Sequence, residues 1–198
     1  MKTKYDVTID RFKWISGSDI PAIMGISPFT TRFDLLLFKA ELKENDFKGN
    51  EYTRYGQIME PKIRNYINKE YKLKYRPSKH EFIEKRYRCH TDGEDKSSIL
   101  EIKTTSKDCK TIRGYKIYLV QLLFYMYNIG KEEGKLVVYI RPEDFNEDLD
   151  TERIKIFNIR LEDYKDLVQE IEEEVIKFKK DIKRVLDNPL IEEWELDE

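Results

Sequence analysis

The chain has 198 residues, carries a net charge of −2, and is 38% charged and 39% hydrophobic. This length fits one domain with its own hydrophobic core, and no apolar run reaches the roughly 18 residues that a membrane span needs. The first residues are not followed by the apolar core of a signal peptide, and Cys89 and Cys109 are too few for a four-cysteine iron–sulfur cluster. We therefore expect a cytoplasmic protein with free thiols and no membrane contact.

The net charge hides an asymmetry along the chain. Residues 1–120 hold 25 Lys and Arg against 17 Asp and Glu, a balance of +8, whereas residues 121–198 hold 12 against 22, a balance of −10. A basic N-terminal part and an acidic C-terminal part would orient a polyanion toward one side of the protein. A solvated helix and chain end explain the acidic part equally well, but they do not explain the basic excess.

The first part of the chain predicts an extended segment followed by three helices. Ser16 or Ser18 can cap the first helix, and Thr30 or Thr31 can cap the second. Pro61 lies inside the third helical pattern and predicts either a kink or a local helix start. The extended segment is expected at residues 5–15, and the helices are expected to end at about 24 and to span 33–42 and 52–71.

The second part predicts five strands and two further helices. Alternating or β-branched apolar runs indicate strands at about 80–84, 86–91, 98–104, 135–141 and 153–160. Apolar periodicity indicates helices at about 113–128 and 162–186. The order helix, three strands, helix, strand is typical of a small mixed α/β core, an α+β mixed sheet. We expect a single domain over residues 1–198, with its core at about 52–160.

The stretch from Asp92 to Lys103 carries residue types that suit a metal site. Side chains at i and i+2 of a strand share a face, so Glu101 and Lys103 should project together, and Asp92 at the end of the preceding strand could meet them across a hairpin. A hard divalent cation takes carboxylate ligands, lowers the pKa of a bound water and neutralises charge on a phosphodiester. Lys103 would donate to the water or the phosphate, or act as a base if desolvation lowers its pKa.

Plainer interpretations exist for the same residues. Glu101 and Lys103 could form a solvent-facing pair, which is the commonest reason for Glu-x-Lys on a strand. Asp92 and Gly93 could form only a hairpin turn, or a turn that also aims a ligand. Two histidines, His80 and His90, are better explained as structural than as catalytic residues.

Four segments along the chain carry a family resemblance. They are an opening segment at 11–28, a Gly-x-x-x-Glu-Pro helix at 55–61, a strand with Glu-x-Lys at 100–106 and a glutamine-containing helix at 118–126. In this order they resemble the YqaJ-like, phage lambda exonuclease-type viral recombinases of the PD-(D/E)XK nuclease superfamily. The resemblance covers about residues 11–140, although the residue before Asp92 is Thr91 rather than proline. It implies a restriction-endonuclease-like core with N-terminal helices and a long C-terminal helix.

The resemblance implies a metal-binding role for the central residues. Asp92 and Glu101 would bind Mg²⁺ or Mn²⁺, together with the backbone carbonyl of Ile102. Glu60 would lie near the same ion, through a second metal or a water, although alone it fits a surface helix residue. Lys103 would orient or deprotonate the attacking water. General acid–base help of this kind typically contributes about 10²–10⁴-fold.

The resemblance also implies three contacts around that centre. Arg11 and Ser18, within an N-terminal segment at 11–42, match a pair that cradles a DNA phosphate. The Arg11 fork suits a terminal phosphate because it binds two oxygens at once, and Ser18 adds a hydroxyl near a helix start. Gln121 matches a glutamine near the site. Taken alone, Arg11 fits a surface charge and Gln121 fits a residue that only fills a helix.

The last predicted helix has a narrow apolar seam. Its members recur at steps of four and three: Tyr164, Val168, Ile171, Val175, Phe178, Ile182 and Val185. We expect this seam to pack along its own domain. A subunit contact is the alternative, because the lambda-type enzymes form ring trimers that enclose DNA.

Together with the residues at 92–103, the resemblance implies a Mg²⁺-dependent exonuclease that degrades one strand of linear duplex DNA from a 5′ end. The resemblance further implies a single-strand annealing protein as a partner and the host-cell cytoplasm as the location if a phage encodes the chain. Two alternatives remain open at this point. One is an endonuclease of the same superfamily, and the other is a non-catalytic DNA-binding or host-interaction protein on the same fold.

Overall fold

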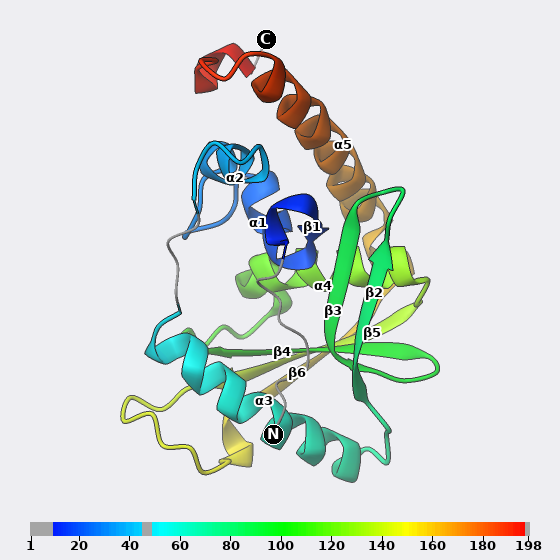
Figure 1. Cartoon of the computed structure of the whole chain (residues 1–198). Coiled ribbons are helices and arrows are strands. Elements are labelled where there is room, and N and C mark those ends of the chain that lie inside the picture. The colour runs from blue at the N-terminus through cyan, green and yellow to red at the C-terminus, as the bar shows by residue number, and fades with distance from the viewer. Residues whose placement is uncertain (1–9, 45–48, 197–198) are drawn as a thin grey trace.

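The structure, a computed structural model, describes residues 10–44 and 49–196. The helices in these ranges are α1 (Ile20–Ile23), α2 (Arg32–Lys39), α3 (Glu51–Glu70), α4 (Lys116–Ile129) and α5 (Lys165–Asp187). The strands are β1 (Ile15–Ser16), β2 (Arg76–Phe82), β3 (Tyr87–Glu94), β4 (Ser98–Thr105), β5 (Glu133–Ile140) and β6 (Ile154–Arg160). This is the predicted mixed α/β architecture, with N-terminal helices and a long C-terminal helix (Figure 1).

The described strands form one mixed sheet. Its main path is β1-β3-β4-β5-β6, and β2 pairs with β3 off this path. β4 and β5 are parallel from Ser98↔Glu133 to Thr105↔Ile140, whereas β3–β4 and β5–β6 are antiparallel. A parallel pair needs a crossover connection, and α4 provides it between β4 and β5. The strand that carries Glu101 therefore lies in the middle of the sheet.

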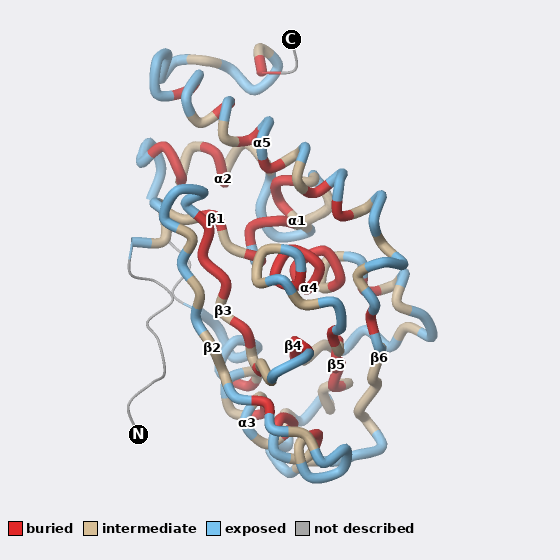
Figure 2. Tube along the Cα trace, turned by 90° about the vertical axis from the view of Figure 1, so that its right-hand side faces the viewer, coloured by how far each residue is buried: buried red, intermediate tan, exposed pale blue. Residues whose placement is uncertain are grey.

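Helices cover both faces of this sheet. α4 packs on β4 and β5, with α1 and α5 against it, whereas α3 packs against β4 from the other face (Figure 1). Each face has its own apolar cluster. One includes Val120 and Phe124 of α4, and the other includes Met59 and Ile63 of α3. In Figure 2 buried positions run through α4 and the central strands. β4 is thus buried on both faces, which explains its nearly continuous apolar run.

The N-terminal segment departs from the prediction of an extended stretch at 5–15. Residues 5–9 lie outside the described part of the chain. Arg11–Lys13 form a 3₁₀ turn, and only Ile15–Ser16 pairs as a strand, in parallel with the start of β3. Alternation over a few residues does not distinguish a strand from a turn whose apolar side chains pack inward. Thr31 caps α2, with its hydroxyl accepting from Asp34 N at 3.0 Å.

α3 runs unbroken from Glu51 to Glu70, so Pro61 does not start a new helix. The Asn50 side chain caps α3 by accepting from Thr53 N at 3.0 Å. Proline at this position removes one hydrogen bond from the helix. The apolar face of α3 against the sheet compensates for it.

The apolar seam of the C-terminal helix is buried inside the chain. Its members Val168, Ile171, Val175, Phe178 and Val185 all join the larger core cluster, and α5 packs against α1, α2 and α4. A 3₁₀ turn at Leu161–Tyr164 precedes α5, so the helix begins slightly later than predicted. The seam therefore packs along its own domain, as expected, and a ring trimer stays a prediction.

Two further sequence expectations concern the membrane and the thiols. Across the described residues, no helix combines the length and the apolar character that crossing a membrane requires. Cys89 is buried and Cys109 is partly buried, and both are free thiols. Burial raises the pKa of Cys89 to about 12, so this thiol is unreactive at neutral pH.

Candidate active site

β4 presents two charged residues to the α4 face of the sheet. Ile99 packs in the cluster beneath α4, whereas Leu100 and Ile102 pack beneath α3. Alternation places Glu101 and Lys103 on the Ile99 side, and Lys103 Nζ lies 2.8 Å from Glu101 Oε1. Glu101 is 1% exposed, so the interpretation of a solvent-facing pair is wrong.

β3 and β4 separate next to this pair. They are paired at Gly93↔Leu100 and Glu94↔Ile99 only, and the start of β3 pairs with β1 instead. Asp92 lies where the strands diverge, and its Oδ2 accepts a hydrogen bond from Ile102 N at 2.8 Å. The Asp92 side chain thus takes the place of a strand partner, and this brings its carboxylate beside β4.

The predicted turn at Asp92 and Gly93 is wrong, because both residues lie within β3. The turn falls at Asp95–Ser97 instead, where Asp95 Oδ1 accepts from Ser97 N at 2.9 Å and Ser98 N at 2.8 Å. Gly93 is needed for close packing. A Cβ there would lie 2.8 Å from Tyr75 Cβ and 3.0 Å from Leu100 Cβ.

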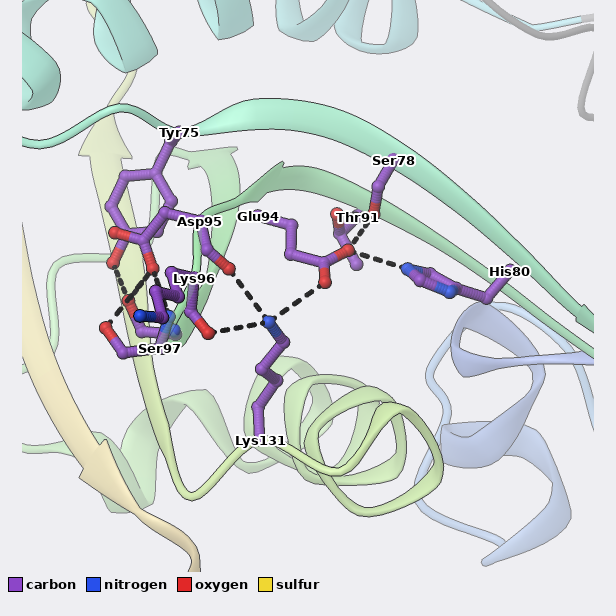
Figure 3. Close-up of polar contacts among 10 residues, drawn as sticks. Tyr75, Ser78, His80, Thr91, Glu94, Asp95, Lys96, Ser97 and Lys131 are labelled. Carbon is purple, nitrogen blue, oxygen red and sulfur yellow. Dashed lines mark hydrogen bonds and ion pairs between the residues drawn. The ribbon is translucent and has the colours of Figure 1, made fainter.

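A second carboxylate of β3, Glu94, anchors the hairpin (Figure 3). Its Oε2 accepts from Ser78 Oγ at 2.6 Å and lies 2.6 Å from His80 Nε2, and its Oε1 lies 3.0 Å from Lys131 Nζ. Partial burial acts to raise the pKa of Glu94, but Ser78, His80 and Lys131 outweigh it and lower that pKa to about 2. His80 therefore has a structural role here, as expected.

The electrostatic balance at Asp92 and Glu101 is the opposite. Burial is the main cause that raises the pKa of Asp92 well above its ordinary value, and the nearby Glu101 and Glu60 raise it further. Burial also raises the pKa of Glu101 and outweighs the effect of Lys103. Burial acts to lower the pKa of Lys103, but Glu101 and Asp92 reverse this and raise it. This raised pKa favours the charged ammonium form, and the role of Lys103 toward the attacking water stays a prediction.

α4 contributes an amide to the same cluster. Gln121 Nε2 donates to Glu101 Oε1 at 2.6 Å, and the Tyr125 hydroxyl lies 3.4 Å from that nitrogen. Gly17 packs on this part of α4, where a Cβ would lie only 2.5 Å from the Tyr125 ring. Gln121 is thus placed beside Glu101 and is more than helix filler.

α3 brings Glu60 to the site from the opposite layer. Arg64 NH1 donates to Glu60 Oε1 at 2.6 Å and to the Asp92 backbone oxygen at 2.8 Å. Arg64 therefore ties α3 to β3 next to the cluster. Sequence reasoning missed Arg64, although its i,i+4 spacing from Glu60, beside the buried Ile63, was a usable signal.

The donor set fits a divalent cation in part. Glu101 Oε1 accepts from Gln121 and lies by Lys103, whereas Glu101 Oε2 is buried without a hydrogen-bond partner among the described residues. A buried carboxylate oxygen without a partner is costly, and a hard cation would satisfy it. In the described ranges, no three His, Cys, Asp or Glu side chains form a complete metal-ligand group. An ion would thus rest on Asp92 and Glu101 with other oxygens around it, and the Ile102 carbonyl and Glu60 stay predicted ligands.

The N-terminal segment is held by a buried ion pair that sequence reasoning missed. Lys39 Nζ lies 2.8 Å from Asp19 Oδ2 and donates to the backbone oxygens of Trp14 and Arg11 at 2.6 and 3.0 Å. Arg11 NH2 lies 3.4 Å from Asp19 Oδ1. Burial acts to raise the pKa of Asp19, but Lys39 and Arg11 outweigh it and lower that pKa. A lysine within an apolar helix carries no sequence signal for this pairing.

Arg11 and Ser18 line one cleft, of about 710 Å³. Thr104 and Thr105 at the end of β4 line it too, directly after Lys103. The structure therefore brings the two predicted phosphate ligands to the cleft at the end of the strand that carries Glu101. The ring of Tyr118, another lining residue, lies 5.8 Å from Lys103 Nζ.

Comparisons with known proteins agree with this fold. A model of the YqaJ-like viral recombinase domain matches residues 8–130. No curated protein is significantly similar in sequence.

Two exonucleases of known structure have a similar fold. An alkaline exonuclease from Laribacter hongkongensis aligns with a TM-score of 0.61 at 18% identity, over 89% of this chain and 91% of that one. Its complex with dAMP aligns with a TM-score of 0.63, also at 18% identity, over 89% and 91% of the two chains. A phage-related exonuclease from Haemophilus somnus 129PT aligns with a TM-score of 0.64 at 16% identity, over 88% and 95% of the two chains. These alignments confirm the predicted fold class.

Proposed function

We propose a metal-dependent deoxyribonuclease activity for this chain, which belongs to the YqaJ-like viral recombinase domain family. The proposed reaction is hydrolysis of phosphodiester bonds in linear duplex DNA, from a 5′ end toward the 3′ end. The observation that carries the proposal is the burial of the Glu101 carboxylate. It is buried next to Asp92, and one of its oxygens has no hydrogen-bond partner in the described part of the chain.

The proposed cofactor is Mg²⁺ or Mn²⁺, held by Asp92 and Glu101. Such an ion supplies a water of lowered pKa and neutralises charge on the reacting phosphate. The raised pKa values of both carboxylates support this assignment, because burial disfavours their charged forms more than Lys103 favours them, and a cation would add further positive charge.

The protein's own groups would position the reactants. Lys103, an ammonium 2.8 Å from Glu101 Oε1, would donate to the attacking water or to a phosphate oxygen. Gln121 would fix the Glu101 carboxylate through its 2.6 Å hydrogen bond. Arg11 and Ser18, on the wall of the cleft, would hold the terminal 5′ phosphate.

The test is incubation with linear duplex DNA that carries one labelled 5′-phosphate end, in Mg²⁺, in Mn²⁺ and in chelator. We expect release of label as mononucleotide in either metal and none in chelator. The Glu101→Gln variant is the matched control. A wild-type protein that leaves linear DNA intact in both metals would remove the catalytic proposal and favour a DNA-binding role.

A circular duplex separates the exonuclease from the endonuclease. An enzyme that needs a free end leaves the circle intact, whereas cutting of the circle at a rate similar to linear DNA would assign an endonuclease.

The wider setting is also a proposal. We propose that residues 1–198 form one nuclease domain and that the protein acts in the host cytoplasm. A single-strand annealing protein as partner and a ring trimer are proposed from the family alone.

A further inference from the structure

The cleft that contains Arg11 has a second arginine, Arg141. Most of the other polar lining residues are hydroxyl-bearing or amide side chains, including Ser18, Asn50 and Thr105. Asp19 is the one carboxylate among the described lining residues, and it is paired with Lys39 and Arg11. The cleft is therefore neutral to basic and rich in hydrogen-bond donors, which suits the phosphates of a nucleic acid.

Arg141 lies directly beside the end of the strand that carries Glu101. It follows the last residue of β5, and its backbone N donates to Thr105 O at 2.8 Å. Thr105 pairs with Ile140 in the sheet. The parallel β4–β5 pair thus brings Arg141 to the cleft three positions beyond Val138, the residue that pairs with Lys103.

Two aromatic rings hold the Arg141 guanidinium. Its central carbon lies 4.4 Å from the Tyr52 ring centroid and 4.9 Å from the Phe145 centroid. The two rings lie 5.5 Å apart, and Phe145 also contacts the Tyr55 ring edge-on at 5.5 Å. Aromatic contact fixes a guanidinium while leaving N–H donors for a planar acceptor.

No ion pair neutralises Arg141 within the described residues. By contrast, Arg11 contacts Asp19 at 3.4 Å, and Arg153 contacts Asp150 at 3.2 Å. An arginine that is held by rings rather than by a carboxylate keeps its charge available to a ligand. Its place at the cleft indicates an anionic ligand.

We propose that Arg141, held by Tyr52 and Phe145, forms a second phosphate-binding subsite, which takes an internal phosphodiester of the DNA. This inference rests on the proposed nuclease function and adds to it. The subsite is separate from Arg11 and Ser18, which would take the terminal phosphate.

The surroundings of Arg141 also limit where the DNA can lie. Arg141 and Ser106 are shared with a neighbouring cavity of about 670 Å³, whose other lining residues include Glu143, Asp144, Asp148 and Asp150. Arg153 also lines this cavity and pairs with Asp150, but the remaining carboxylates still repel a polyanion. Arg141 therefore marks the end of the surface that favours DNA, and the strand leaves the cleft before this acidic cavity.

The test measures binding in chelator, so that cleavage does not interfere. A labelled linear duplex with a 5′ phosphate is titrated with wild type, Arg141→Gln and the matched control Arg153→Gln, at several salt concentrations. One lost phosphate contact predicts a roughly tenfold weaker affinity for Arg141→Gln, and a salt slope shallower by about 0.7 to 0.9. Arg153→Gln should keep the wild-type slope. Equal slopes and affinities for both variants would overturn the inference.

Ring variants test how the guanidinium is held. Tyr52→Phe retains the ring and should bind like wild type, whereas Tyr52→Leu should weaken binding less than Arg141→Gln does. If Arg141→Gln does not fold, Arg141→Lys decides the question: an affinity several-fold below wild type supports a guanidinium subsite, and wild-type affinity contradicts it.

The outcomes also separate this inference from the proposed function. Failure of wild type to bind or cleave DNA contradicts the proposed function itself. Wild-type cleavage together with unchanged binding by Arg141→Gln contradicts only the second subsite.

Discussion

Strand β3 carries two carboxylates, Asp92 and Glu94, whose pKa values are shifted in opposite directions. Glu94 contacts Ser78, His80 and Lys131, and its pKa falls to about 2. Burial, together with the nearby Glu101 and Glu60, raises the pKa of Asp92 well above its ordinary value and outweighs the effect of Lys103. The partners of Glu94 therefore outweigh its burial, whereas at Asp92, where β3 and β4 diverge, Lys103 does not outweigh burial and the two nearby glutamates.

Asp19 extends the comparison to a fully buried group. It is as inaccessible as Glu101, yet Lys39 and Arg11 lower its pKa, whereas the pKa of Glu101 is raised. Burial alone therefore does not decide which carboxylate is functional. The unbalanced charge is what supports the proposed site, because a ligand can supply the charge that a buried carboxylate without a full set of partners lacks.

The largest expected effect is on the rate of DNA cleavage, which should separate Glu101 from Glu94. Glu101→Gln removes the charge but retains the shape, and we expect cleavage of linear DNA to fall by at least about 10³-fold. Glu94→Gln is the matched control and should cleave within a few-fold of wild type if it is assayed well below its melting temperature. Steady-state rates with a 5′-labelled duplex measure both. Equal losses in the two variants would show that the site assignment is wrong.

The second prediction concerns folding stability without metal. Asp19→Asn leaves Lys39 buried without its counter-charge, and we expect a loss of about 3–5 kcal/mol in the free energy of unfolding. Glu101→Gln should be neutral or stabilising, because it removes a buried charge that burial disfavours. Urea denaturation of chelator-treated protein measures both.

A double variant provides the control for the Asp19 effect. Asp19→Asn combined with Lys39→Met removes both charges, and it should recover part of the stability that Asp19→Asn loses. No recovery would mean that the loss comes from other contacts of Asp19, such as its bond from Ser16 N at 2.9 Å.

The third prediction adds the cation. A divalent ion that binds only the folded protein stabilises it by about 2.7 kcal/mol at one hundred times its dissociation constant. We expect Mg²⁺ or Mn²⁺ to raise the melting temperature of wild type and of Glu94→Gln. Glu101→Gln should show little of this increase. An increase of the same size in Glu101→Gln would place the ion elsewhere.

Much of the fold was predictable because the sequence patterns match burial. The apolar run at 98–104 predicted a strand and the apolar seam of α5 predicted packing along its own domain, and both predictions are confirmed. Pairing of Glu101 with Lys103 followed from alternation alone. The extent of β3 did not, because Asp-Gly is a common turn signal, whereas Gly93 and Glu94 continue the strand by pairing with Leu100 and Ile99.

Apart from the i,i+4 pair of Arg64 with Glu60, the contacts that sequence reasoning missed are long-range. Lys39 reaches Asp19, and Arg64 reaches the backbone of Asp92, across 20 and 28 residues of chain. Arg141 meets Tyr52 because the end of β5 and the start of α3 both reach the same cleft. Such pairs depend on tertiary packing, which no local pattern in one sequence specifies.

The smallest expected effect is a pH dependence that separates the two kinds of carboxylate. Glu94 and Asp19 have lowered pKa values, so below their ordinary values of 4.5 and 3.8 the unfolded chain binds more protons and stability rises with pH. Asp92 has a raised pKa, so above its ordinary value of 3.8 the folded state binds more protons and stability falls as pH rises. As the pH rises, the free energy of unfolding of metal-free wild type should therefore fall by about 1.4 kcal/mol for each unit by which the folded pKa of Asp92 exceeds 3.8. Asp92→Asn should flatten this decline while leaving the rise at acidic pH intact, as measured by denaturation of both proteins from acidic to neutral pH. Parallel curves for the two proteins would show that Asp92 titrates normally and that the site does not lack positive charge.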